Sequence, residues 1–424
     1  MIDTIFALSS GRPPAAISVI RISGPRAHLA AKQIAGSLPE ARNAAVRELR
    51  DPFSGELLDE ALVLRFDAPA SSTGEDIAEL HCHGGRAVVD AVLATLRAVE
   101  GLREAQPGEF TRRAFENGRI DLTEAEGLAD LIEAETESQR KAAMALAEGG
   151  LRKQIAAWQD RVLTLSAIAE QAIDYDEDDA GVDPALQREC AMLSGELRQW
   201  LERPRIEPLK DGVRVVVAGP PNAGKSSLIN RIAGEERAIV TDIPGTTRDH
   251  IEVPLSLGGV PIRLTDTAGL RETTDAVEAI GVQRAELLTK LADVLVWLGC
   301  PSDQPPHPRT LLVHAKADLP GAAVPEGSIA VSVVTDAGIA DLLRAVEATA
   351  RSVLPTEDAV SLNRRQARHV SEAAEATLLA SKAPDWLLVA EELRHARTSF
   401  DRLTGRAGVD DMLDALFGRF CLGK

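Results

Sequence analysis

Residues 213–234 read VRVVVAGPPNAGKSSLINRIAG and contain a complete GxxxxGKS loop from Gly219 to Ser226. Five of the six residues before the loop are apolar, which is typical of a buried parallel strand. The glycines allow backbone N–H groups to turn around an anion at the start of a helix. Lys225 is expected to reach the β- and γ-phosphates, and the Ser226 hydroxyl to hold Mg²⁺. The segment therefore predicts a nucleotide-binding domain.

Two later motifs fit the same site. Asp266 to Gly269 reads DTAG and closes a predicted strand, so the Asp266 carboxylate is expected to touch Mg²⁺ through water and the Gly269 N–H to sense the γ-phosphate. Residues 245–249 read GTTRD, and Thr247 is expected to complete the Mg²⁺ shell. A polar turn is the alternative interpretation of GTTRD taken alone.

The guanine-recognition motif departs from its usual NKxD form, because residues 315–318 read AKAD. Asp318 keeps the carboxylate that accepts two hydrogen bonds from the base. Ala315 lacks the amide, so we expect weaker nucleotide affinity or looser loops, by about 1–3 kcal/mol if a buried partner is left unsatisfied. The later loop has Ser332-Val333-Val334 where Ser-Ala is more usual. GTP specificity is still predicted.

The water-orienting glutamine that many small GTPases carry after DxxG is replaced by Leu270, which cannot hold water. Another residue must orient the water. Glu278, at the start of a predicted helix, is the candidate. Composition alone favours the alternative that it is one of many exposed helical glutamates.

Composition indicates a soluble cytoplasmic chain. Its 424 residues suggest about two or three domains, and no segment is apolar enough to span a membrane or reads as a secretion signal. Four cysteines without a CxxC pair argue against a zinc site or a disulfide framework. A net charge of −18 disfavours general nucleic-acid binding, so an RNA partner would need a local basic patch or a second subunit.

The chain divides by pattern into an α+β domain (1–118), a helical segment (119–209), a doubly wound, mainly parallel α/β domain (210–355) and a second helical segment (356–424). The α/β domain is thus inserted into a helical domain. The acidic run 176–179 reads as a solvated connector, because it lacks the alternating ligands and glycine of a calcium loop.

Strand-like runs support this division. They fall at 15–22, 61–66, 77–81, 213–218, 262–266, 294–298, 311–315 and 329–334, with one helix near 87–99 in the first domain.

The chain resembles the MnmE (TrmE) family of tRNA-modification GTPases over its whole length. The resemblance rests on these stretches besides the GTPase motifs: DTIFAL at the start, RISGP at 21–25, TGEDIAELHCHGG at 73–85, PGEFTRRAFENGRIDLTEAE at 107–126 and FCLGK at 420–424. It implies an N-terminal folate-binding and dimerising domain, a helical domain and an inserted Ras-like GTPase domain.

The resemblance also implies an activity. With the flavoprotein MnmG, which carries FAD, the family adds a carboxymethylaminomethyl or aminomethyl group at C5 of the wobble uridine of certain tRNAs, and a reduced tetrahydrofolate is thought to donate the one-carbon unit. A homodimer, a heterotetramer with the partner, and GTP hydrolysis activated by K⁺-dependent dimerisation of the GTPase domains follow from it. The open alternative is a GTP-regulated assembly switch that does no modification chemistry.

Site residues carry over from the family position by position. The catalytic residue is Glu278. Nucleotide contacts fall on Asn222, Ala223, Gly224, Lys225, Ser226, Ser227, Thr241, Thr246, Thr247, Asp266, Gly269, Lys316 and Asp318. Magnesium falls to Ser226 and Thr247, and potassium to Asn222, Thr241, Ile243 and Thr246. Folate contacts fall on Arg21, Glu79, Arg119 and Lys424, with Arg119 standing where the family usually has lysine.

Two further groups of residues have competing interpretations. A metal site at His81-Cys82-His83 is disfavoured, because two ligands at this spacing have no obvious second pair. Cys421 in FCLGK is a possible reactive thiol by resemblance, although a buried cysteine is the common alternative and only Lys424 nearby could lower its pKa.

Overall fold

The computed structural model describes residues 3–175, 181–235, 252–266, 287–319, 324–355, 360–407, 410–418, 420 and 423. The chain forms two compact units, Met1–Ala129 with Asp401–Lys424, and Asp130–Phe400. Among the described residues, no helix is long and apolar enough to cross a membrane.

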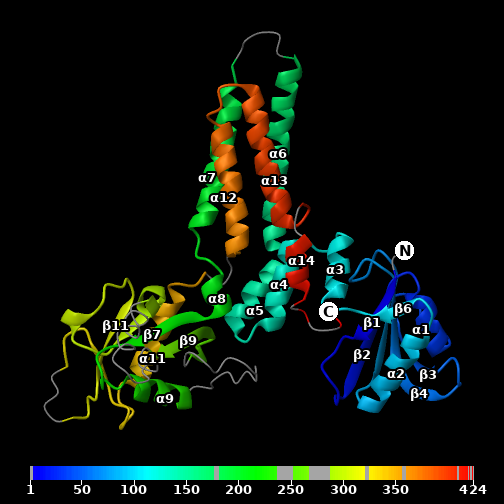
Figure 1. The fold of residues 1–424 in the computed structure, drawn as a ribbon, viewed down its shortest axis with the longest axis horizontal. Helices are drawn as coiled ribbons and strands as arrows, with labels where there is room; N and C mark the ends of the chain where they lie inside the picture. The colour runs from blue at the N-terminus through cyan, green and yellow to red at the C-terminus, as the bar shows by residue number, and fades with distance from the viewer. Residues whose placement is uncertain are drawn as a thin grey trace, which may run out of the picture. The chain divides into compact units, whose positions relative to one another are not determined.

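The first unit is built on a six-stranded sheet in the order β3-β4-β5-β2-β1-β6 (Figure 1). Its strands are β1 (Thr4–Leu8), β2 (Ile17–Ser23), β3 (Ala44–Arg50), β4 (Leu57–Phe66), β5 (Ile77–His83) and β6 (Leu102–Glu104). Neighbours pair antiparallel except β1 and β6, which are parallel. This sheet with its helices is the α+β domain that the sequence predicted.

One face of this sheet is apolar and packs against α1 (Ala27–Ala35) and α2 (Arg86–Ala98). Strand alternation places Ile20, Leu80 and Cys82 on that face, fully buried. On the opposite face, α3 (Glu109–Glu116) brings Phe110 against Ile5 and Ala7 of β1. Polar residues of β2 and β5 therefore lie on the face that α1 and α2 leave uncovered.

Two more helices complete the first unit. Helix α4 (Leu122–Glu133) begins in it and packs against α14 (Asp410–Phe417) through Leu122, Leu413 and Phe417. The C-terminal part of the chain thus returns to the N-terminal unit.

The second unit contains a sheet in the order β12-β11-β10-β7-β9-β8. Its strands are β7 (Val213–Ala218), β8 (Glu252–Leu257), β9 (Val260–Asp266), β10 (Val294–Trp297), β11 (Thr310–Ala315) and β12 (Ile329–Val331). All pairs are parallel except β8 with β9. The predicted mainly parallel doubly wound sheet is confirmed; the edge strand β8 was not predicted from the sequence.

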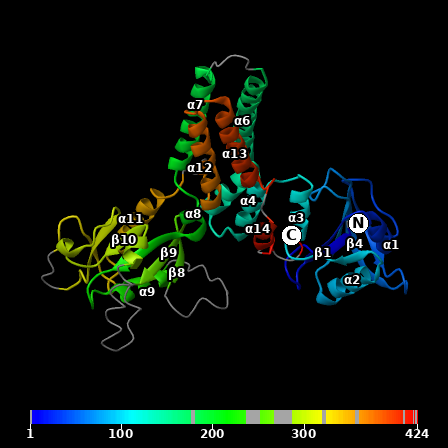
Figure 2. The same ribbon diagram turned by 45° about the horizontal axis from the view of Figure 1, so that its top comes forward.

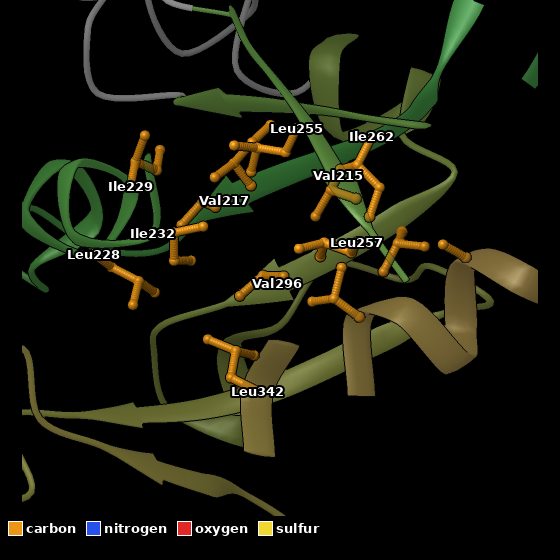
Figure 3. Close-up of a cluster of buried hydrophobic side chains, with 14 of the residues drawn as sticks. Val215, Val217, Leu228, Ile229, Ile232, Leu255, Leu257, Ile262, Val296 and Leu342 are labelled. Atoms are coloured by element: carbon orange, nitrogen blue, oxygen red, sulfur yellow. The ribbon is translucent and has the colours of Figure 1, made fainter. Parts of the chain in front are cut away.

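Helices α9 (Lys225–Glu235) and α11 (Ile339–Arg351) pack on one face of this sheet through a large apolar cluster. Figure 3 shows Val217 and Val296 of the sheet facing Leu228 and Ile232 of α9 and Leu342 of α11. A smaller cluster on the opposite face joins the sheet to the helical segment at 287–291. Burial on both faces explains why these strands read as continuous apolar runs.

One strand prediction was too long. The run 329–334 was expected to be extended throughout, but β12 ends at Val331. The Ser332 hydroxyl accepts the N–H groups of Val334 and Thr335, each at 3.2 Å, and these bonds turn the chain out of the sheet.

The remainder of the second unit is helical. Its helices are α5 (Glu137–Ala147), α6 (Gly150–Tyr175), α7 (Pro184–Glu202), α8 (Glu207–Asp211), α12 (Arg364–Ala380) and α13 (Trp386–Thr404), and α13 ends in the first unit. The four long helices α6, α7, α12 and α13 run side by side (Figure 1, Figure 2). Trp158 of α6 fills their core, stacked on Phe400 at 5.9 Å between ring centres. The acidic run 176–179 lies outside the described residues.

Candidate functional site

The phosphate loop connects β7 to α9 and takes the shape that its glycines allow. Gly219 has φ +151°, and a Cβ there would lie 2.7 Å from the carbonyl oxygen of Leu298. Gly224 has φ +95°, and Asn222 also lies in the left-handed region at φ +59°. Asparagine is among the few residues with a side chain that adopt this conformation readily. The loop thus places backbone N–H groups at the N-terminus of α9, where an anion is favoured.

Two side chains of α9 meet this loop. Lys225 is 7% exposed, and its Nζ donates to the carbonyl oxygens of Gly219 at 2.9 Å and Pro220 at 2.8 Å. The Ser226 hydroxyl donates to Asp266 Oδ2 at 2.6 Å. Asp266 is buried at the carboxyl end of β9, the strand next to β7. The structure thus brings together three residues that sequence motifs forty positions apart predicted.

The oxygen atoms of Ser226 and Asp266 fit a magnesium ion. Mg²⁺ prefers hard oxygen ligands and keeps several waters, so a hydroxyl and a carboxylate at the edge of a phosphate cradle are suitable partners. Both belong to the ends of rigid elements, α9 and β9.

The predicted base-recognition residues follow β11. Lys316 has φ +59°, and its Nζ donates to the Asn222 carbonyl oxygen at 2.9 Å, so this loop touches the phosphate loop. Asp318 is exposed two residues further on. Ala315 packs against the apolar core of the sheet and lies 4.0 Å from the position of a Cβ on Gly224. An asparagine amide at position 315 would therefore lie where the loop after β11 meets the phosphate loop.

Of the remaining predicted phosphate-loop residues, Ala223 lies within the loop and Ser227 is the third residue of α9. The other predicted residues of this site lie outside the described residues: Thr241, Ile243, Thr246, Thr247, Gly269 and Glu278.

A second group of predicted residues, which we call the Arg21 group, meets on the first sheet. Arg21 of β2 pairs with Glu79 of β5 in the strand register, and Nε and Nη2 of Arg21 each lie 2.8 Å from Oε1 of Glu79. The Arg21 guanidinium also lies 5.7 Å from the ring centre of Phe110 on α3. The pair sits on the face opposite α1 and α2.

His81 also belongs to this group, although it was not predicted as a site residue. His81 Nε2 lies 3.2 Å from Oε2 of Glu79. Burial pushes the pKa of Glu79 upward, but the hydrogen bonds and charges of His81 and Arg21 outweigh burial and leave this pKa below its ordinary value. The two-residue spacing of Glu79 and His81 on one strand was the signal that could have found the contact.

Another predicted folate contact, Arg119, lies beside the loop before β5. Cγ and Cδ of Arg119 lie 3.2 and 3.4 Å from the position that a Cβ on Gly74 would take, so the Arg119 side chain covers this part of the loop. Lys424 and Cys421 lie outside the described residues. Gly423 is described, and a Cβ there would lie 2.0 Å from the carbonyl oxygen of Leu8. Gly423 therefore lies beside Leu8 at the end of β1, the strand next to the one that carries Arg21.

The stretch His81-Cys82-His83 is not arranged as a metal site. Cys82 points into the apolar core, and burial raises the pKa of its thiol to about 12. His83 Nδ1 instead lies 2.7 Å from Asp59 on the other face. Among the described residues, a group with metal-ligand spacing occurs elsewhere, at His28, Asp67 and Asp76.

The fold and the phosphate site define the chain as a P-loop GTPase that contains an α+β domain and a helical domain in addition to its nucleotide domain. Two family profiles cover nearly all of it: the N-terminus of GTP-binding protein TrmE matches residues 4–119, and the MnmE helical domain matches residues 122–421.

Similar proteins span the whole chain. The tRNA modification GTPase MnmE of Erythrobacter litoralis (strain HTCC2594) is 52% identical over 426 residues, covering 100% of both chains. The protein of the same name from Novosphingobium aromaticivorans is 51% identical over 438 residues, again covering 100% of both. The chain therefore belongs to the MnmE family.

Proposed function

We propose that this chain hydrolyses GTP as the GTPase subunit of tRNA wobble-uridine modification, in the cytoplasm. The observation that carries the proposal is the meeting of Lys225, Ser226 and Asp266 at one end of a mainly parallel sheet. It occurs in a chain that is 52% identical, over its full length, to a protein named tRNA modification GTPase MnmE. The domain division 1–118, 119–209, 210–355 and 356–424 is part of the proposal.

The described residues account for phosphate binding. Lys225 leaves the two loop carbonyls to contact the β- and γ-phosphates, and the backbone N–H groups of the loop hold the same oxygens. Ser226 and Asp266 would hold Mg²⁺, directly and through water respectively, and the ion would neutralise charge that develops on the transferred phosphoryl group. Thr247 would complete the magnesium ligands.

The finer parts of the mechanism rest on the family resemblance. K⁺ would bind Asn222 together with Thr241, Ile243 and Thr246 when two GTPase domains meet, and would supply the positive charge that an arginine finger supplies in other GTPases. Glu278 would orient the water, because Leu270 cannot. The homodimer and the flavoprotein partner MnmG, forming a heterotetramer, belong to the same proposal.

A reduced folate would bind on the open face of the first sheet. The carboxylate of Glu79, held by Arg21, suits the donor edge of a pterin, while Arg119 and Lys424 suit its glutamyl carboxylates. The folate would supply the one-carbon unit. The approach of Gly423 to Leu8 supports a role for the C-terminal residues at this site.

The first test is GTP hydrolysis by the full chain in K⁺ against Na⁺ buffer, with ATP and Glu278→Ala as comparisons. Hydrolysis that needs K⁺, prefers GTP and collapses in the variant is expected. Equal rates in the two buffers, with an active variant, would reject the proposed mechanism.

The net charge of −18 favours a second candidate, a GTP-regulated assembly switch without modification chemistry. Nucleoside analysis of tRNA from a deletion strain separates the two. Loss of the modified wobble uridine supports the modification enzyme, and unchanged nucleosides support the switch.

A further inference from the structure

The nucleotide site has an apolar contact where its two loops meet. Ala315 ends β11 against the apolar core and faces Gly224 of the phosphate loop. An amide at this position could hydrogen-bond to the loop, whereas a methyl group cannot. Any polar connection between the loop after β11, which carries the predicted base-recognition residues, and the phosphate loop must come from other residues.

The loop after β11, which carries the predicted base-recognition residues, is connected to the loop 332–338. We call these two loops the base-side loops. The Ala317 N–H donates to the Val331 carbonyl oxygen at 3.1 Å, which joins the loop after β11 to the end of β12. Beyond β12, the Ser332 N–H donates to the Ala337 carbonyl oxygen at 2.9 Å and closes the loop 332–338. The loop after β11 and the loop 332–338 are therefore connected through the end of β12.

Two charged side chains connect this pair of loops to the phosphate side. The first is Lys316, which donates to the Asn222 carbonyl oxygen. The second is Arg231 of α9, whose Nε lies 2.5 Å from Oδ1 of Asp336 in the loop 332–338. Arg231 follows Lys225 by less than two turns of the same helix. This ion pair therefore joins the helix that carries the phosphate-binding lysine to the base-side loops.

Asp336 makes this contact from an uncommon backbone conformation. Asp336 lies at φ +60°, a conformation that aspartate and asparagine adopt more readily than most residues. The hydrogen bond from Arg231 lowers the pKa of the Asp336 carboxyl group below its ordinary value, which favours the charged form.

We infer that Arg231 is a positioning residue for nucleotide binding: through Asp336 it holds the base-side loops against α9, and it supplies part of the restraint that Ala315 cannot provide. This role goes beyond the proposed function, because it concerns how this chain keeps its nucleotide site assembled with an altered recognition motif. It applies to any guanine nucleotide that the site binds.

A double-mutant cycle tests the inference in the full chain. The dissociation constant of GDP is measured by titration calorimetry at fixed Mg²⁺ and salt for the parent, Arg231→Gln, Ala315→Asn and the double variant. In the parent background, Arg231→Gln should weaken binding about threefold to fivefold, the upper range for an exposed ion pair. With asparagine at 315 the same change should weaken binding less than about twofold, because the amide then restrains the loops.

Two variants keep the test specific. Asp336→Asn removes the same ion pair, tolerates the positive φ and should match Arg231→Gln. Arg344→Gln removes a comparable exposed ion pair to Asp341 on α11, away from the phosphate loop, and should leave GDP binding unchanged. Equal losses in both backgrounds, no loss in either, or the same loss from Arg344→Gln would overturn the inference.

Discussion

The phosphate site and the Arg21 group are assembled in opposite ways. The phosphate site takes a loop, a helix start and a strand end from one parallel sheet, with Lys225 and Ser226 adjacent in the chain. The Arg21 group takes Arg21 from β2, Glu79 and His81 from β5, and a ring from α3, and Arg21 and Glu79 lie 58 positions apart in the chain.

This difference predicts how each site responds to damage. The phosphate loop is held by backbone geometry and by its own helix, so single side chains there affect chemistry more than assembly. The Arg21 group is held by side-chain pairs across strands, so a change in one partner leaves another charge partly buried and unpaired. The following tests separate the two cases.

The largest effect is expected from Lys225→Ala. The phosphates lose their charged contact, and GTP turnover should fall by about 100-fold or more, as when one transition-state donor is removed. Binding of 5-formyltetrahydrofolate, measured by calorimetry on the same sample, should stay within about twofold if the two sites are built independently. A parallel loss of folate binding would contradict that independence.

The next effect concerns Glu79→Gln. Arg21 and His81 lose a shared negative charge, and 5-formyltetrahydrofolate binding should weaken about tenfold, because charge-assisted contacts are the strong ones. GTP turnover should not change. His83→Gln is the matched control on the same strand, since His83 pairs with Asp59 instead, and it should bind folate as the parent does.

A smaller effect is expected from Ala315→Asn, which restores the usual recognition motif. If the amide joins the two loops, GTP binding should tighten by up to about tenfold, corresponding to one hydrogen bond to a buried partner. Titration with GTP and with ATP measures both affinity and selectivity. Unchanged affinity would mean that other contacts already hold the loops fully.

The smallest effect is a pH dependence at the Arg21 group. The folded-state pKa of Glu79 lies below its ordinary value of 4.5, so the unfolded chain binds the proton more readily. The stability from this carboxylate is therefore present above about pH 4.5 and is lost as the pH falls through the folded pKa. Amide exchange in β2 and β5 should show the difference between parent and Glu79→Gln shrinking across that range. A difference that persists at lower pH would contradict the assignment.

The sequence alone predicted much of the phosphate site, because the GxxxxGKS loop and DTAG are local patterns on recognisable strands. The meeting of Ser226 with Asp266 followed from adjacent parallel strands sharing one edge. The contact of Arg231 with Asp336 could not be predicted, since it joins a helix face to a loop 105 positions away. His81 beside Glu79 was within reach of the sequence through strand alternation but was not assigned.

What the sequence determined by itself is the class of site and the fold of each part, because periodicity, glycine positions and short motifs act through local backbone physics. What only the tertiary structure decided is which distant charges meet: Arg21 with Glu79 and His81, and Arg231 with Asp336. Those pairs depend on strand register and on which faces of the elements are buried. Both are set when the apolar surfaces of the whole unit pack together, and no single segment encodes them.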